Sequence, residues 1–446
     1  MSICFLPVES TLRELDYKIN LARLFCAKGL RVIIGNPPFI RDELKYKNYR
    51  AIFLEKGLNP NPDYYKALSD KSIYLYDLAD EGTSEPVYAI NYEPTINALK
   101  VMRKVFLWGA EQRQDLMRRN SEKKLCEKYE VIGNPGFDLC SLKYKNFNRA
   151  LKSTNLPTSY ILINTNFGCF QSFSMEEHLE ACTLISPISI QMMRDSYLKE
   201  EEQFKVFEVW LENIIQAFPN ENFLVRPHPS EISENYKKLF EKYKNVMVSK
   251  EGNVNYVTAS AKLVLHKDCS TALQSYLMGI PSISLGGDSL YKEYVQWPLN
   301  FSARPKNLDA AKEMIECVLK TEKFDHHLQS EIDKQAKNCL DKYFYNLGGS
   351  SNALVDIIVK DAEDLIKNKS LCKLIDTRTK IQKLKLFIRK KMPLHYKVAK
   401  AARETLVEFT KKDIVRRLDL LESIDPLGLS YHVKKIFPNT FEISIK

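Results

Sequence analysis

The chain has 446 residues, a length that corresponds to two or three domains of ordinary size. With 44% hydrophobic and 27% charged residues it is neither disordered nor fibrous. The net charge of +10 lies in residues 371–446, which hold 18 basic and 8 acidic side chains of the 66 and 56 in the chain, leaving 48 of each sign in the first 370 residues. This neutral body excludes a nucleic-acid-binding core, whose basic surface lies on the fold itself.

Short apolar runs alternate with helical patterns in the first third of the chain. We expect a helix over residues 12–27, where apolar residues recur at helical spacing and Gly29 follows as a C-cap. The predicted strands of this part are residues 3–6, 31–34, 72–75, 105–108 and 130–132. Such alternation is typical of parallel sheets with helical crossovers.

A second alternating series follows, and a linker separates it from the first. Residues 143–159 are mostly polar and include Pro157, which favours an interdomain linker. The predicted strands of the second series are residues 160–163, 223–225, 263–265 and 282–285. The sequence therefore predicts two doubly wound α/β halves, with a ligand cleft between them lined by the carboxyl ends of strands.

The segment Arg226-Pro227-His228-Pro229 carries the clearest chemistry. A predicted strand delivers Arg226 and His228 to its carboxyl end, and Pro229 ends it. Guanidinium neutralises negative charge and imidazolium can donate a proton, so the pair suits a phosphate-bearing leaving group. The alternative is a structural histidine near a turn.

The strand at residues 263–265 leads into a second candidate segment. Ser270 and Thr271 lie at the start of the predicted helix 272–279, where free N–H groups, hydroxyls and the helix dipole favour phosphate. Gln274, one turn later, can reach a ribose hydroxyl. Ser270 and Thr271 can also be ordinary caps. Together the two strand ends favour a site for a nucleotide sugar.

Several motifs, taken in order, resemble the bacterial surface carbohydrate biosynthesis protein family. They are the opening PVE at residues 7–9, GNP at 133–135, LINTNFG at 162–168, RPHP at 226–229 and CSTALQSYLMGIP at 269–281. The resemblance spans roughly residues 3–365. Two positions depart from the family pattern, because Gln274 stands where Glu is common and Gly136 where Arg is common.

The resemblance implies an α/β glycosyltransferase of GT-B fold, similar to bacterial sialyltransferases and Kdo transferases. Such an enzyme has two Rossmann-like domains facing across a cleft. Here they correspond to residues 1–150, which bind the acceptor, and 151–370, which bind the nucleotide sugar; a basic helical region occupies 371–446. The donor is a CMP-activated nonulosonic acid of the sialic, legionaminic, pseudaminic or Kdo type. The acceptor is a glycan or lipid-linked glycan of the capsule, lipopolysaccharide or O-antigen.

The family's acidic motif matches Asp80-Glu81-Gly82, and its His-Pro motif matches His228-Pro229. An inverting transfer needs a carboxylate to deprotonate the acceptor while the phosphate leaves from the opposite face, so Asp80 or Glu81 is expected to be the base. His228, with Arg226, Ser270 and Thr271, is expected to stabilise the departing phosphate. A solvated acidic turn is the alternative for residues 80–82. The chain has no Asp-x-Asp triplet, so no metal and no other cofactor is expected.

Four further residues are weaker candidates for acceptor or cleft contacts. Glu9 and Arg13 follow the first strand, where they can face an acceptor or form a structural ion pair. Asn134 and Asn166 lie at strand ends and can line the cleft or form turns.

The location of the protein follows from other features of the sequence. Ten scattered cysteines without zinc-ligand spacing indicate reduced thiols in a cytosolic protein. The N-terminal residues do not resemble a signal peptide, and no apolar run approaches the ~18 residues of a membrane span. In residues 380–423, apolar side chains beside clustered Lys and Arg favour a helix on the anionic inner face of the cytoplasmic membrane. A solvated helix packed on the body is the alternative.

Three other functions are open on the sequence alone. A CDP-glycerol-type glycerophosphotransferase shares an Arg-Pro-His-Pro-like strand, and a UDP-GlcNAc 2-epimerase-like isomerase shares a Gly-Asn motif and a His-Pro region. The third is an inert scaffold of a polysaccharide assembly complex, which the departures at Gln274 and Gly136 leave open.

Overall fold

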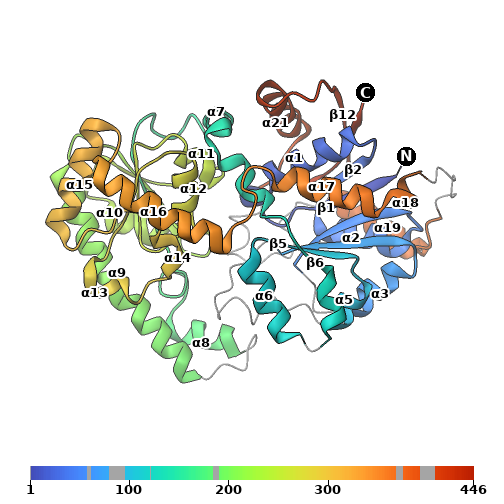
Figure 1. Ribbon diagram of the computed structural model, residues 1–446, viewed down its shortest axis with the longest axis horizontal. Coiled ribbons are helices and arrows are strands. Elements are labelled where there is room, and N and C mark those ends of the chain that lie inside the picture. Colours follow the sequence, from blue (N-terminus) through green and yellow to red (C-terminus); the bar gives the residue numbers. More distant parts are fainter. Residues whose placement is uncertain are drawn as a thin grey trace. The chain divides into compact units, whose positions relative to one another are not determined.

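The computed structural model describes residues 2–57, 62–79, 96–120, 122–183, 190–367, 375–391 and 407–446 (Figure 1). The chain divides into two compact units, one formed by Met1–Leu139 with Leu340–Lys446 and the other by Cys140–Cys339. Each unit contains a largely parallel sheet connected by helices. The predicted α/β class with two Rossmann-like domains is confirmed.

The sheet of the first unit has the strand order β12-β13-β2-β1-β3-β4-β5-β6. Neighbours from β2 to β6 pair in parallel, and β13 pairs antiparallel with β2. The strands are β1 (Ile3–Pro7), β2 (Arg31–Gly35), β3 (Ala51–Lys56), β4 (Ile73–Leu78), β5 (Lys104–Leu107), β6 (Tyr129–Val131), β12 (Tyr431–Phe437) and β13 (Thr440–Ile445). All five predicted strands of this part are confirmed, and β3 is an addition.

Helices connect these strands and cover them. The predicted first helix is α1 (Thr11–Ala27), and Gly29 beyond its end has a φ of +81°, as a C-cap glycine requires. The other helices of the unit are α2 (Pro37–Tyr46), α3 (Pro62–Ser69), α5 (Ile96–Val101), α6 (Ala110–Arg119), η1 (Lys123–Lys128), η2 (Pro135–Cys140), α17 (Ser350–Asp361), α18 (Glu363–Lys367), α19 (Lys380–Lys391) and α21 (Lys411–Ile424). Helix α17 packs beside α1, so residues far apart in the sequence share one layer (Figure 1).

The C-terminal region differs from the helical extension that the sequence predicts. It ends in the hairpin β12–β13, and Phe441 and Ile443 of β13 are fully buried beside β2. Gly35 at the end of β2 has a φ of +141°, and a Cβ there would lie 1.9 Å from the carbonyl oxygen of Asn439. Residues 340–446 thus complete the N-terminal unit, whereas the sequence predicted boundaries at 150 and 370.

The sheet of the second unit has the order β11-β10-β7-β8-β9 and is parallel throughout. Its strands are β7 (Ile161–Asn164), β8 (Phe223–Arg226), β9 (Val246–Val248), β10 (Leu263–His266) and β11 (Ser282–Ser284). Its helices are η3 (Leu142–Tyr144), α7 (Lys145–Leu151), α8 (Met175–Thr183), α9 (Ile190–Ala217), α10 (Ser233–Phe240), α11 (Val254–Thr258), α12 (Thr271–Leu277), α13 (Gly287–Tyr291), α14 (Gln296–Leu299), α15 (Leu308–Thr321) and α16 (His326–Tyr343), which continues into the first unit. The four predicted strands are confirmed, and β9 is an addition.

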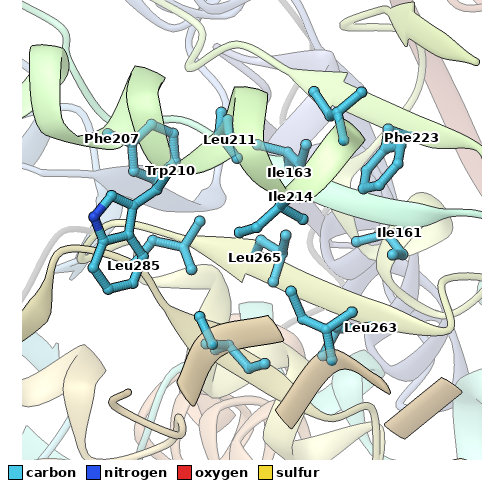
Figure 2. Close-up of a cluster of buried hydrophobic side chains, with 14 of the residues drawn as sticks. Ile161, Ile163, Phe207, Trp210, Leu211, Ile214, Phe223, Leu263, Leu265 and Leu285 are labelled. Atoms are coloured by element: carbon cyan, nitrogen blue, oxygen red, sulfur yellow. The ribbon is translucent and has the colours of Figure 1, made fainter. Parts of the chain in front are cut away.

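The core of the second unit forms between one face of this sheet and helix α9. Alternate strand residues point to the same face, so Ile161 and Ile163 of β7 lie beside Leu263 and Leu265 of β10 (Figure 2). From α9, Phe207, Trp210, Leu211 and Ile214 pack onto them (Figure 2). This apolar layer fixes the strands whose carboxyl ends carry the candidate site.

The polar stretch predicted as a linker is helical in its first half. Residues 145–151 form α7, in which Phe147 and Asn148 are buried, and the Asn148 side-chain amide donates to the Tyr144 carbonyl at 3.1 Å. Helix α7 packs against α11 and so belongs to the second unit. In the part of the chain that the structure describes, no helix is long and apolar enough to cross a membrane.

Candidate functional site

The strand order of each unit defines a point where the chain direction across the sheet reverses. In the second unit this switch point lies between β7 and β10, and in the first between β1 and β3. Loops leave such neighbouring strands in opposite directions, which opens a crevice at their carboxyl ends where α/β proteins bind ligands. The residues after β7, β8 and β10 therefore form the candidate site of the second unit.

Asn166, after β7, meets Asp268, after β10, at the switch point of the second unit. The Asn166 side-chain amide donates to Asp268 Oδ1 at 2.9 Å, and the Val295 N–H donates to Asp268 Oδ2 at 3.0 Å. Asp268 is buried, whereas Asn166 is half-buried. The carboxylate thus holds the Asn166 side-chain nitrogen, which leaves the side-chain oxygen Oδ1 as the acceptor atom of this amide.

Lys267 lies beside this pair in an aromatic environment. Its ammonium is 5.0 Å from the ring centre of Phe167 and 5.4 Å from that of Tyr294, within cation–π range. The Lys267 ammonium also donates to the backbone carbonyl of Asn166 at 3.4 Å, and it lies 3.8 Å from Asp268 Oδ1. This buried cation offsets the charge of Asp268 and helps to fix the loop after β7.

The loop after β8 is organised by a buried carboxylate. Glu231 accepts the backbone N–H of His228 at 2.9 Å, the N–H of Phe167 and the hydroxyl of Thr165. The Thr165 hydroxyl also accepts the His228 N–H at 3.2 Å. Burial raises the pKa of Glu231, and these donors oppose that effect. Glu231 therefore ties the loops after β7 and β8 into one rigid piece.

The His228 ring has an assignable tautomer. The Ser230 N–H donates to His228 Nδ1 at 3.3 Å, and the Ser230 hydroxyl lies 2.8 Å from the same atom. A backbone amide can only donate, so Nδ1 accepts and the proton of the neutral ring is on Nε2. A Cβ on Gly168 would lie 2.9 Å from the Ser230 hydroxyl, so this loop needs glycine there. His228 is half-buried, and in this tautomer Nε2 carries the ring N–H.

Ser270 and Thr271 behave differently from each other at the start of α12. The Thr271 hydroxyl is buried and accepts the Asn164 side-chain amide at 3.0 Å, which joins the ends of β7 and β10. Ser270 is exposed and makes no side-chain capping hydrogen bond. Of these two hydroxyls, Ser270 is the one that a ligand can reach directly.

Arg226 and Gln274 bind protein atoms in this structure. The Arg226 guanidinium donates to the carbonyls of Glu251 at 3.0 Å and Gly252 at 2.6 Å, and burial lowers its pKa to about 10. The Gln274 side-chain amide donates to Asn255 Oδ1 at 2.8 Å. Their predicted contacts with phosphate and ribose stay predictions.

Pro229 lies in the loop after β8, next to His228, and its carbonyl accepts a hydrogen bond from the Lys250 ammonium at 3.3 Å. Lys250 also donates to the Glu231 carbonyl. Pro229 thus contributes through its backbone carbonyl to the position of His228. Lys250, which follows β9, stabilises the end of the Arg-Pro-His-Pro segment through these two hydrogen bonds.

The switch point of the first unit carries a charged cluster. Glu14 is buried and accepts the N–H of Glu9 at 3.0 Å and of Ser10 at 3.1 Å. The Lys56 ammonium, at the end of β3, lies 2.7 Å from Glu14 and 3.2 Å from Glu9. Glu9 itself is 72% exposed and Arg13 is exposed. Both weaker candidates therefore lie at the edge where a ligand of this unit is expected.

Two other predictions have different outcomes. The Asn134 side-chain oxygen accepts the Gly136 N–H at 2.7 Å, so this buried residue forms a turn. Asp80 and Glu81 lie outside the described residues.

Sequence reasoning missed Glu231, Asp268, Lys267, Thr165 and Lys56 as parts of these clusters. Each lies at or just beyond the carboxyl end of a strand, or in the Arg-Pro-His-Pro loop. This position at the end of a predicted strand is the sequence feature from which they could have been predicted. Among the residues that the structure describes, no three His, Cys, Asp or Glu side chains are grouped so as to hold a metal ion.

Comparisons with known proteins give matches to solved structures only, since no protein-family model and no curated protein matches the chain. The fold is similar to UDP-GlcNAc 2-epimerase from Neisseria meningitidis bound to UDP-GlcNAc, with a TM-score of 0.49 and 12% identity over 81% of this chain and 100% of that one. It is similar to the Methanocaldococcus jannaschii UDP-GlcNAc 2-epimerase in complex with UDP-GlcNAc and UDP, with a TM-score of 0.46, 12% identity, and 81% and 100% coverage. The wall teichoic acid polymerase TagF has a TM-score of 0.45 and 12% identity over 82% of this chain and 90% of its own. These likenesses concern the fold alone.

Proposed function

We propose that the protein is an inverting, metal-independent glycosyltransferase. It transfers a nonulosonic acid of the sialic, legionaminic, pseudaminic or Kdo type from a CMP-sugar to a bacterial surface glycan. The observation that carries the proposal is that His228, Asn166 and Ser270 follow the carboxyl ends of β8, β7 and β10, three adjacent strands, with His228 and Asn166 held by the buried carboxylates of Glu231 and Asp268 and the Ser270 hydroxyl exposed. Rigid, preoriented donors and acceptors are what a nucleotide site needs.

The groups at this edge suit a phosphate and a ribose. His228 Nε2–H and the Ser270 hydroxyl can donate to phosphate oxygens, and the side-chain oxygen Oδ1 of Asn166 can accept a hydrogen bond from a sugar hydroxyl. The cations Arg226 and Lys267 bind backbone carbonyls, so the proposed phosphate contacts come mainly from neutral donors. A nucleoside monophosphate, with a single phosphate group, fits such a site better than a diphosphate.

The proposed reaction breaks the bond between the anomeric carbon and the phosphate oxygen of the donor. The acceptor oxygen forms the new glycosidic bond, its proton passes to Asp80 or Glu81, and CMP leaves with the bonding electrons. His228 stabilises the charge that develops on the departing phosphate by donating from Nε2. Glu9 and Arg13 are proposed to contact the acceptor from the first unit.

Calorimetric titration of the full chain with CMP, CDP, UDP and UMP tests the donor assignment. We expect CMP to bind most tightly and His228→Ala to weaken it at least about tenfold, the loss of a charge-assisted hydrogen bond. His327→Ala is the matched control, because His327 is exposed on α16. Tight UDP binding with no response to CMP contradicts the proposal and favours an epimerase-like isomerase.

Turnover of a CMP-sugar with a glycan acceptor tests the reaction itself. We expect Asp80→Asn or Glu81→Gln to abolish transfer while leaving CMP binding and folding intact, and we expect EDTA to have no effect. Transfer of glycerophosphate from CDP-glycerol identifies the phosphotransferase instead. Failure of every donor to bind or turn over supports the scaffold.

A further inference from the structure

Helix α19 presents its apolar side chains to solvent. Ile381, Leu384, Phe387 and Ile388 are 68%, 58%, 56% and 47% exposed. Their spacing of three, four and seven residues places them on one side of the helix. An ordinary surface helix buries such a stripe against its own protein. In α19 the stripe faces solvent instead.

The opposite side of α19 faces the first unit. Gln382 and Leu386 are half-buried there, and the Gln382 side-chain amide donates to the Tyr46 hydroxyl at 3.2 Å. Arg389 forms an ion pair with Asp42 of α2 at 3.3 Å. The apolar stripe therefore points away from the body because polar contacts hold the other side of the helix.

The segment before α19 fixes this orientation. Arg378 is buried and forms ion pairs with Glu43 at 2.6 Å and with Asp376 at 3.1 Å. The Thr377 N–H and hydroxyl both donate to the Tyr46 carbonyl at 2.9 Å. A buried arginine held by two carboxylates is costly to displace, so the helix starts at a fixed place beside α2.

The charge of α19 is of one sign. Its twelve residues include Lys380, Lys383, Lys385, Arg389, Lys390 and Lys391 and no acidic residue. On a helical wheel, Lys383 and Lys390 flank one side of the apolar stripe and Lys385 the other, and Lys380 and Lys391 stand at its two ends. Cations that border an exposed apolar face are the pattern of helices that lie in a membrane interface.

Helix α21 shows that this pattern does not extend along the whole predicted segment 380–423. It mixes Lys and Arg with Asp413, Asp419 and Glu422, and it buries Ile414 and Leu418 against the body. The combination of exposed apolar and unbalanced positive side chains is therefore confined, within the described residues of this segment, to α19.

We infer that α19 binds the surface of a bilayer rich in anionic lipid and lies in its interfacial layer. Such a surface offers both a negative potential for the lysines and an apolar layer for Leu384 and Phe387. A nucleic acid offers the charge without the apolar layer, and an apolar protein groove does not require six cations. The inference is independent of the proposed glycosyl transfer.

Co-sedimentation of the full chain with phosphatidylglycerol vesicles, and with phosphatidylcholine vesicles, tests this. We expect binding to the anionic vesicles only, and at least about tenfold weaker binding for the double variant Leu384→Gln/Phe387→Gln. The matched control is Leu198→Gln/Val209→Gln, two exposed apolar residues of α9. Circular dichroism and thermal unfolding check that each variant folds, and CMP titration, expected to be unchanged, keeps the result separate from the proposed function.

The charge contribution is tested with Lys383→Gln/Lys385→Gln/Lys390→Gln against Lys323→Gln/Lys334→Gln/Lys337→Gln, which removes three exposed lysines from the second unit. Only the first triple variant is expected to lose vesicle binding and its salt dependence. Equal binding to both vesicle types, no binding by the wild type, or no effect of the Leu384/Phe387 change overturns the inference. A change of oligomeric state in that variant, with vesicle binding intact, shows that the face contacts protein instead.

Discussion

The carboxylate of Glu231 accepts the backbone N–H of His228 at 2.9 Å, three residues before it in the chain. The same carboxylate accepts the N–H of Phe167 and the hydroxyl of Thr165 from the loop after β7. An ionised carboxylate accepts hydrogen bonds only, so three donors can converge on it. The position of the His228 ring thus depends on a side chain that has no direct access to a ligand.

Replacement of Glu231 by Gln is expected to disturb this convergence. One oxygen becomes an NH2 group that faces a donor, and the cost is about 1–3 kcal/mol in the free energy of unfolding. We also expect the affinity for CMP to fall at least about tenfold, because His228 moves. Urea unfolding and calorimetry measure the two effects.

Glu234→Gln is the control, since Glu234 is an exposed residue of α10 that pairs with Lys237 at the surface. It is expected to change stability by less than about 0.5 kcal/mol. Unchanged stability and unchanged CMP affinity in Glu231→Gln would show that Glu231 does not determine the position of His228.

Arg226 is expected to act on stability more than on ligand binding. Arg226→Met leaves the Glu251 and Gly252 carbonyls without their donor, which costs about 1–3 kcal/mol in the free energy of unfolding. CMP affinity is expected to fall less in this variant than in His228→Ala. A larger loss of affinity than in His228→Ala, at unchanged stability, would show direct phosphate contact by Arg226.

His266 is expected to make the protein sensitive to acid. Burial lowers the pKa of His266 from 6.5 to about 4, and the ring is bonded to the Ser302 hydroxyl at 2.7 Å. As the pH falls, the unfolded chain takes up this proton before the folded chain does. Stability is therefore fully present above pH 6.5 and decreases between pH 6.5 and about 4, by ~1.4 kcal/mol per pH unit.

The variant His266→Gln keeps a donor for Ser302 but cannot titrate. Urea unfolding of both proteins from pH 7 to pH 4 is expected to show a flatter acid limb in the variant. Parallel curves for the two proteins would mean that His266 is not responsible for the loss.

Gly35 is expected to be essential for attachment of the C-terminal hairpin. In Gly35→Ala the methyl group would overlap the Asn439 carbonyl, so we expect a loss of about 3 kcal/mol or more. Gly428→Ala is the control, because Gly428 also has a positive φ, +70°, but nothing lies within 4 Å of its Cβ position. It is expected to cost only about 1–2 kcal/mol in the free energy of unfolding. Equal losses would assign the effect to backbone strain alone.

The central strands could be predicted because their apolar runs are long enough to be recognised. β9 has three half-buried residues at a sheet edge. β3 was missed although its buried apolar run, residues 51–54, is as long as the runs of the predicted strands. The hairpin was predicted to belong to a basic helical region because residues 371–446 together hold the excess positive charge, to which Lys434 and Lys435 of the edge strand β12 contribute. The buried residues of β13 indicate a strand of the first sheet only once β2 is known to lie beside them.

The candidate site was predictable as a set of strand ends and less so as a set of contacts. His228 and Asn166 could be placed at one sheet edge because parallel strands end together. The direction of the Arg226 side chain depends on carbonyls 25 and 26 residues away in the chain, which no local pattern indicates. Glu231 was visible in the sequence, but its role depends on donors from the loop after β7.

The hairpin of residues 431–445 also affects when the first unit can finish folding during synthesis. Residues 140–339 form the second unit from one continuous stretch, so that unit can fold as soon as it has left the ribosome. The edge of β2 stays without its neighbour until residues 440–443 emerge, more than 400 residues after β2 itself. During that interval the nascent chain carries an open strand edge, a feature that favours pairing with other chains.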